Sequence, residues 1–166
     1  YESLGKWADA APVLAELQRL EQALTLPHRA RLRNYLAIQT PGDAEALLLE
    51  GVRLAQECGE VLLEAKARLN LVGRVYGPTG RMREAKRQLA VILASPDVGG
   101  MALWRGVALM NLGNASWVEG NPQKGEQYLR RAARIFRRAG LAHREPEAAN
   151  NLSALLGEMG AFAKGA

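Results

Sequence analysis

The stretch "MNLGNASWVEGNPQKGEQYLRRA", residues 110–132, shows the clearest regularity of the chain, because its spacing of small and apolar residues recurs on both sides. The upstream stretch "LNLVGRVYGPTGRMREAKRQLAVI", residues 69–92, repeats it and places Gly73 in the position of Gly113. The downstream stretch "NNLSALLGEMGAFAKGA", residues 150–166, repeats it at the same step. The step between these stretches is 40 residues. A fixed period of this length indicates a repeat architecture in which each unit is one supersecondary element.

One small residue marks the same position in every unit. It stands at Ala10, Ala44, Ala85, Gly125 and Gly165. With Gly113, this pattern resembles the tetratricopeptide repeat (TPR) family, whose unit is a pair of antiparallel helices with a small residue on each helix at their closest crossing. The resemblance predicts that Gly113 and Gly125 meet at one crossing, with Gly73 and Ala85 in the equivalent places.

The resemblance implies an all-α fold, a right-handed superhelical solenoid of about eight helices arranged as antiparallel hairpins. The steps between these positions are 34, 41, 40 and 40 residues. The first is the standard TPR period, and the steps of about 40 residues resemble the longer bacterial form of the repeat, seen in sensor arrays of transcription regulators. We expect one array over residues 1–166, a fragment of a longer protein. Its expected units are 1–24 (partial), 25–59, 60–98, 99–140 and 141–166 (partial).

Local signals place the helix ends. Thr40 and Asp43 predict a capping box around Pro41, and Gly59 and Gly140 have the positions of helix C-terminal caps. The expected helices cover residues 7–24, 27–39, 41–57, 60–77, 81–93, 101–119, 122–139 and 144–159.

Composition excludes several classes of protein. Aromatic residues make up 5% of the chain, and no apolar run has the roughly 18–20 residues that cross a bilayer. Cys58 is the only cysteine, so no internal disulfide forms, and a cytoplasmic location is expected. His28 and His143 are the only histidines, at spacing unsuited to a metal cluster.

No set of catalytic residues is recognisable. The segment "GPTGRMREAKR", residues 77–87, has glycines and basic residues, but it lacks the Gly-Lys-Ser/Thr ending of a phosphate-binding loop and follows a helix. We therefore expect a protein that is not an enzyme, has no cofactor and no metal, and acts by binding.

In the TPR family, side chains of the first helix of each hairpin line a concave groove. Carried onto this chain, the groove positions with recognition chemistry are Arg29, Arg33, Asn70, Arg74, Met110, Asn111, Asn114, Trp117, Asn150 and Asn151. Arginine and asparagine suit carboxylates and peptide backbone, so we expect a protein or peptide partner that is acidic or carries a carboxylate. Polar helix faces without a ligand, and core packing for Trp117, are the alternatives.

A second basic feature is the segment "LRRAARIFRRAG", residues 129–140. Its arginines face away from the apolar residues of the same helix; they are Arg130, Arg131, Arg134, Arg137 and Arg138. This face is either a solvated helix surface or a contact for nucleic-acid phosphate or an acidic partner domain. The net charge of +5 favours acidic partners. The resemblance to the sensor arrays of transcription regulators implies a protein-interaction or ligand-sensing module of a larger bacterial regulator. The alternative is a nucleic-acid-contacting scaffold; self-association through the terminal helices is possible, and no membrane partner is expected.

Overall fold

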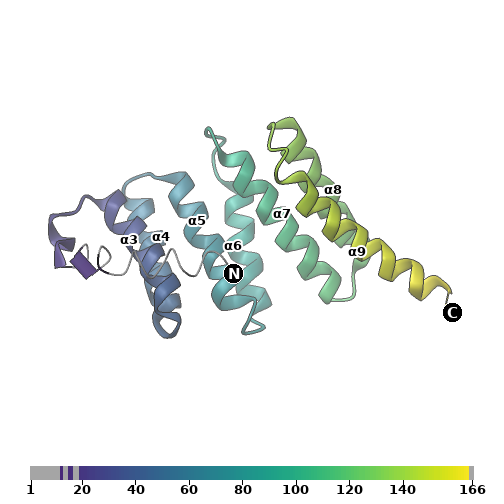
Figure 1. Ribbon diagram of the computed structural model, residues 1–166, viewed down its shortest axis with the longest axis horizontal. Coiled ribbons are helices and arrows are strands. Elements are labelled where there is room, and N and C mark those ends of the chain that lie inside the picture. Colours follow the sequence, from purple (N-terminus) through teal and green to yellow (C-terminus); the bar gives the residue numbers. More distant parts are fainter. Residues whose placement is uncertain (1–11, 13–14, 17–18, 165–166) are drawn as a thin grey trace. The chain divides into compact units, whose positions relative to one another are not determined.

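The computed structural model describes residues 12, 15, 16 and 19–164, and in these residues all regular structure is helical. The all-α class predicted from the sequence is therefore confirmed (Figure 1). The α-helices are α3 (Leu26–Gln39), α4 (Ala44–Glu57), α5 (Val61–Leu71), α6 (Met82–Ala94), α7 (Met101–Val118), α8 (Pro122–Arg138) and α9 (Glu145–Lys164). Half of the predicted helix at residues 7–24 lies outside the described part of the chain, and so do Ala10 and Gly165. Its predicted end is wrong, because residues 21–23 form a separate 3-10 turn.

Three short helical segments complete the elements. Two are 3-10 turns, η1 (Glu21–Ala23) and η2 (Pro41–Asp43), and the third is the π-helical segment η3 (Val72–Tyr76). Since η3 follows α5 directly, the helix predicted at 60–77 is present but changes to a wider turn in its last part. The chain divides into two compact units, residues 1–75 and residues 76–166.

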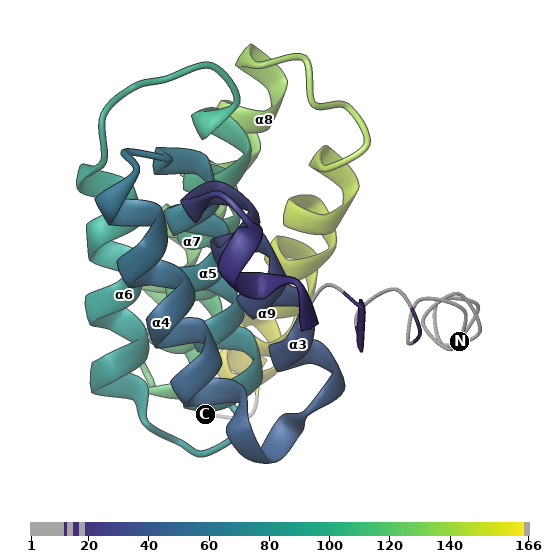
Figure 2. The ribbon, with the colours of Figure 1, turned by 90° about the vertical axis from the view of Figure 1, so that its left-hand side faces the viewer.

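The first unit is built on the contact between α3 and α4, which lie side by side in Figure 2, with α5 packed against α4. The helices approach closely at Gly51 of α4, where an added Cβ would lie 3.3 Å from Nδ2 of Asn34 on α3. Ala30 of α3, Leu54 of α4 and Leu63 of α5 are buried together in one apolar cluster. Small residues on α3 and α4 thus bring the two backbones together, as expected for a helical hairpin.

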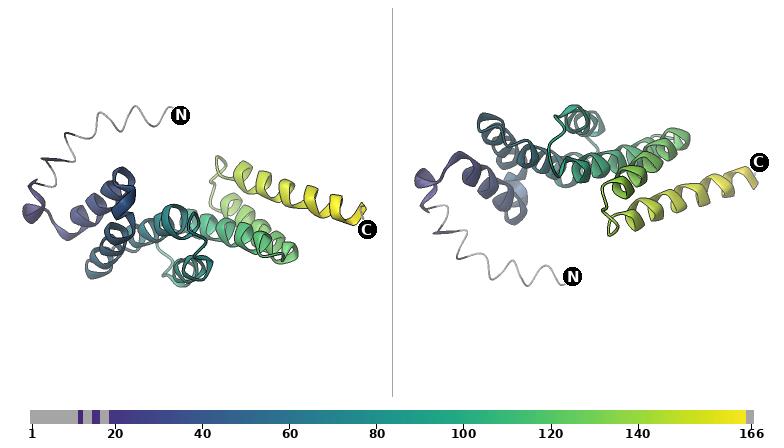
Figure 3. Two further views of the ribbon diagram at one scale, coloured as in Figure 1. Left: turned by 90° about the horizontal axis from the view of Figure 1, so that it is seen from below. Right: turned by 90° about the horizontal axis from the view of Figure 1, so that it is seen from above.

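In the second unit, α7 and α8 form the most extensive helix contact, and α9 lies beside α8 in Figure 1 and in both views of Figure 3. The crossing predicted at Gly113 and Gly125 is confirmed. A Cβ on Gly113 would lie 2.8 Å from Leu129 and 3.2 Å from the carbonyl oxygen of Gly125. A Cβ on Gly125 would lie 2.9 Å from the carbonyl oxygen of Gly113. Side chains at these two positions would push the helices apart, so the crossing depends on glycine.

A second close approach in the same unit lies between the first part of α7 and the last part of α8. A Cβ on Gly106 would lie 2.2 Å from ring atom Cε1 of Phe136, and Phe136 is fully buried. Leu109 and Ala148 close the same cluster from α7 and α9. The aromatic ring of α8 therefore occupies the space that the missing side chain of Gly106 leaves free.

Four glycines with positive φ end helices in the same way, and they stand at Gly59, Gly80, Gly120 and Gly140. After each of them the next N–H donates to the carbonyl five residues back, as in Arg81 to Tyr76 at 2.8 Å and Asn121 to Ser116 at 2.8 Å. This is the Schellman motif, which satisfies the last carbonyls of a helix. The helix ends predicted at Gly59 and Gly140 are confirmed, and the matching turns at Gly80 and Gly120 reproduce the period of the repeat.

Three further local expectations are wrong. No capping box forms at Thr40, because its hydroxyl donates to the carbonyl of Leu36 and the N-cap residue of α4 is Asp43, which makes no side-chain cap bond. The turn expected at Gly160 is absent, since α9 continues to Lys164. Gly73 is exposed in η3, and a Cβ there would meet no described atom within 4 Å, so the predicted need for a small residue is not observed.

Candidate functional site

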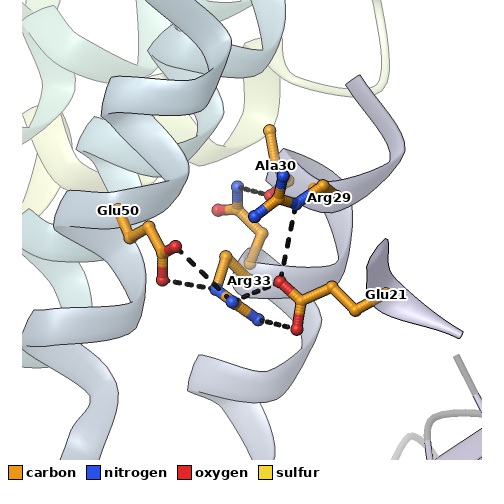
Figure 4. Close-up of polar contacts among 6 residues, drawn as sticks. Glu21, Arg29, Ala30, Arg33 and Glu50 are labelled. Atoms are coloured by element: carbon orange, nitrogen blue, oxygen red, sulfur yellow. Dashed lines mark hydrogen bonds and ion pairs between the residues drawn. The ribbon is translucent and has the colours of Figure 1, made fainter. Parts of the chain in front are cut away.

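Arg33 on α3, a predicted groove residue, is surrounded by carboxylates of the chain itself (Figure 4). Its Nε donates to Glu50 of α4 at 2.5 Å, and its Nη1 donates to Glu21 of η1 at 3.0 Å, with a second bond from Nη2 to Glu21. The Arg33 side chain is only 13% exposed. Burial alone lowers the pKa of Arg33, but the hydrogen bonds that Arg33 donates to Glu50 and Glu21 outweigh it and raise the pKa above its ordinary value.

Arg29, one helical turn before Arg33, shares this cluster. Its Nε lies 3.6 Å from a carboxylate oxygen of Glu21, too far for a hydrogen bond, and this buried nitrogen has no hydrogen-bond partner in the described structure. The expectation that Arg33 is open to an acidic ligand is therefore wrong: Glu21 and Glu50 already supply the carboxylates that a ligand would bring.

Asn70 of α5 is also used within the first unit. Its Nδ2 donates to Oδ1 of Asn34 on α3 at 3.1 Å, and Asn34 in turn donates to the carbonyl of Ala30 at 3.1 Å. Asn34 is 1% exposed, so the bond between the two amides lies inside the unit and links α3 to α5. Arg74 of η3 differs, because it is exposed and makes no ion pair or hydrogen bond with the described residues.

The predicted groove residues of α7 divide into two groups. Met110 packs against the cluster of Leu109 and Phe136, and the amide of Asn111 donates to the carbonyl of Val107 at 2.9 Å, so both are used inside the unit. Asn114 is half-buried, and its amide makes no hydrogen bond to the rest of the described chain. Trp117 is half-buried next to the Gly113–Gly125 crossing, where its backbone nitrogen would lie 3.6 Å from a Cβ on Gly125.

On α9, Asn150 is exposed and Asn151 is half-buried, and neither side chain is bonded within the described residues. Helix α9 contacts α7 as well as α8. On α7 and α9, three asparagine amides have no hydrogen bond within the described residues. They belong to Asn114, Asn150 and Asn151. An amide offers two donors and an acceptor with two lone pairs, so such a surface suits peptide backbone.

The five arginines of α8 also fall into two groups. Arg130 is paired with Glu126 at 2.7 Å, and Arg137 is paired with Glu145 of α9 at 2.7 Å. The other three arginines are exposed and have no ion pair or hydrogen bond in the described structure; they are Arg131, Arg134 and Arg138. The sequence prediction that the helix faces its arginines outward is confirmed, and the ion pairs leave only three of them free.

Over the described residues, no cluster of three histidine, cysteine or acidic side chains could hold a metal ion. His28 and His143 are exposed, and the half-buried Cys58 directs its thiol to the carbonyl of Ala55 at 3.4 Å. The glycine-rich segment from Gly77 to Gly80 is a turn that leads into α6. In the same described residues, no helix is both long and apolar enough to cross a membrane.

Sequence reasoning missed the residues that close the first unit. Glu21 and Glu50 stand on elements other than the first helices of the hairpins, so a list of groove positions does not contain them. Asn34 had a signal that could have been used. It lies four residues after Ala30 and three before Ala37, which are buried on the same face of α3, and a polar residue on such a face requires a bonding partner.

Comparison of the chain with protein-family models, with curated proteins and with solved structures finds no match. Function is therefore argued from the residues and their geometry.

Proposed function

We propose that this chain is a protein-interaction scaffold of TPR-like helical hairpins, the regulatory module of a larger bacterial protein, and that it binds an extended peptide segment. The hairpins support the proposal, because helical repeats present extended surfaces built from several helices. The observation that carries it is the set of unbonded amides on α7 and α9, at Asn114, Asn150 and Asn151.

The contrast with the first unit sharpens the proposal. In the first unit, Arg33 donates hydrogen bonds to Glu50 and Glu21, and Asn70 donates one to Asn34. These side chains therefore stabilise the fold. On α7 and α9 the amides keep their donors and acceptors for a ligand. Trp117, half-buried on α7, supplies an aromatic surface for an apolar side chain of that ligand.

A peptide array probed with the full chain tests the proposal. The double variant Asn114→Ala/Asn151→Ala should lose the peptides that the unchanged chain retains. Gln123→Ala is the matched control, because Gln123 is an exposed amide on α8, outside the proposed surface, and should retain the same peptides. Equal retention by the Asn114→Ala/Asn151→Ala variant would contradict the proposal.

The second candidate function is contact with nucleic acid through α8. The observation in its favour is that Arg131, Arg134 and Arg138 have no carboxylate partner in the described residues. Nucleic-acid binding by these side chains would weaken steeply with added salt, because phosphate contacts release counterions.

A further inference from the structure

The outer face of α8 contains a hollow of about 270 Å³. It is lined by Arg131, Arg134, Ile135 and Arg138. Residues three and four apart lie on one face of a helix, so the spacing of Arg131, Arg134 and Arg138 brings their guanidinium groups to the same side. Three positive charges thus surround one small depression.

Ion pairs neutralise the other two arginines of α8 but not the three that line this hollow. Arg130 is held by Glu126, one turn earlier on the same helix, and Arg137 is held by Glu145 of α9. No described carboxylate lies within ion-pair distance of the three lining arginines. The positive charges at the hollow are therefore not neutralised within the described chain, and an anionic group of a partner would neutralise them.

The hollow also has an apolar part. Ile135 is half-buried and packs against the cluster around Leu109 and Phe136, and these contacts fix the position of its side chain. A ligand that fits this surface carries negative charges beside an apolar group. An extended peptide advances about 3.3 Å per residue and can place acidic side chains on both sides of an apolar one.

We propose that this hollow on α8 binds an acidic segment of a partner protein, with carboxylates at Arg131, Arg134 and Arg138 and an apolar side chain against Ile135. The site goes beyond the proposed function, because it lies on α8 and not on the amide-bearing surface of α7 and α9.

Two observations favour an acidic protein segment over nucleic acid. The basic strip is narrow, since Arg130 and Arg137 on the flank of α8 are paired with Glu126 of the same helix and Glu145 of α9, whose charges would repel phosphates. Proteins that bind duplex DNA by charge commonly make about 6–10 phosphate contacts, more than three arginines supply. Among the described residues that line the hollow there is no aromatic ring on which a single-stranded base could stack.

The test uses fluorescence anisotropy at low salt, with a labelled peptide in which glutamates flank a central leucine. The full chain should bind this peptide. Arg131→Gln/Arg134→Gln should weaken the binding by about tenfold or more. Arg130→Gln/Arg137→Gln removes the same charge from the same helix and is the matched control, with an expected change of about threefold or less. A peptide with serine in place of leucine should bind more weakly.

Four results would overturn the proposal. They are failure of the unchanged chain to bind, equal loss in the two arginine double variants, equal binding of the serine peptide, and displacement of the peptide by a single-stranded or duplex oligonucleotide at lower concentration than unlabelled peptide. Circular dichroism checks that each variant is folded. Failure of the unchanged chain to bind this peptide would leave the array result of the Asn114→Ala/Asn151→Ala variant unaffected, so failure of this site and failure of the α7–α9 surface are distinguishable.

Discussion

Arg33 and Arg131 carry the same guanidinium group in opposite surroundings. Arg33 is 13% exposed and bonded to Glu21 and Glu50, whereas Arg131 is exposed and has no described partner. A buried charge needs its partners, because leaving a desolvated ionic group unpaired is costly. An exposed charge without partners remains available for binding. Arg33 therefore contributes to the stability of the first unit, while Arg131 belongs to a surface.

Replacement of Arg33 tests this difference. Arg33→Met keeps an unbranched side chain but leaves the carboxylates of Glu21 and Glu50 without their donor, so we expect a loss of about 1–3 kcal/mol in the free energy of unfolding. Arg53→Met is the control, since Arg53 is 56% exposed and pairs only with Glu57 on the same helix. Its expected cost is below about 1 kcal/mol. Urea unfolding measures both, and equal costs would show that the Arg33 cluster does not stabilise the fold.

Helix α7 is fitted to α8 by glycines rather than by large side chains. Gly113 meets the backbone of Gly125, and Gly106 leaves room for the ring of Phe136. These contacts lie about two turns apart on α7, so they define both the distance and the register of the two helices. The second unit thus depends on positions where even a methyl group is excluded.

Gly106→Ala should destabilise the protein, because the new Cβ would lie 2.2 Å from Cε1 of the fully buried Phe136. Overpacking of this kind costs about 1–3 kcal/mol. Gly157→Ala is the control: Gly157 is exposed on α9 with no atom within 4 Å of an added Cβ, and alanine there should stabilise the helix by up to about 1 kcal/mol. Thermal unfolding should move the two melting temperatures in opposite directions. A melting temperature of Gly106→Ala at or above that of the unchanged chain would contradict the packing described.

The repeat made part of this packing predictable. Gly113 and Gly125 were found because Gly73 and Ala85 stand one period before them. Gly106 was missed because its counterpart one period earlier is Lys66, and an internal alignment finds only what the units share. The predicted end of the last helix before Gly160 was wrong for a related reason.

Gly120 is followed by Asn121 and Pro122, where the Asn121 side chain accepts a bond from the backbone of Lys124 and starts α8. Gly160 is followed by alanine and phenylalanine, which neither cap nor break a helix, so α9 continues. Glycine spacing alone was therefore insufficient to place a helix end. The site was less predictable than the fold, because the carboxylates that bond Arg33 come from elements outside the repeat positions that were compared.

Throughout the molecule, the helices determine where side chains lie. The hydrogen bonds that those side chains make within the chain determine whether they stabilise the fold or remain available to a ligand. In the first unit the amides of Asn34 and Asn70 bond to each other. In the second unit those of Asn114, Asn150 and Asn151 are unbonded. A binding scaffold of this kind therefore has structural and available amides in the same chain, and the two kinds can be observed separately.

The most direct measurement of the proposed function follows the side-chain amide signals of Asn34, Asn70, Asn114, Asn150 and Asn151 by NMR while a peptide selected on the array is added. The signals of Asn114 and Asn151, with exposed Asn150, should shift with peptide concentration, because their donors and acceptors are open to the ligand. The signals of Asn34 and Asn70 should stay in place, because that pair is already bonded and Asn34 is 1% exposed. Shifts confined to Asn34 and Asn70, or no shift at Asn114, Asn150 and Asn151 at saturating peptide, would contradict the assignment of the binding surface to α7 and α9.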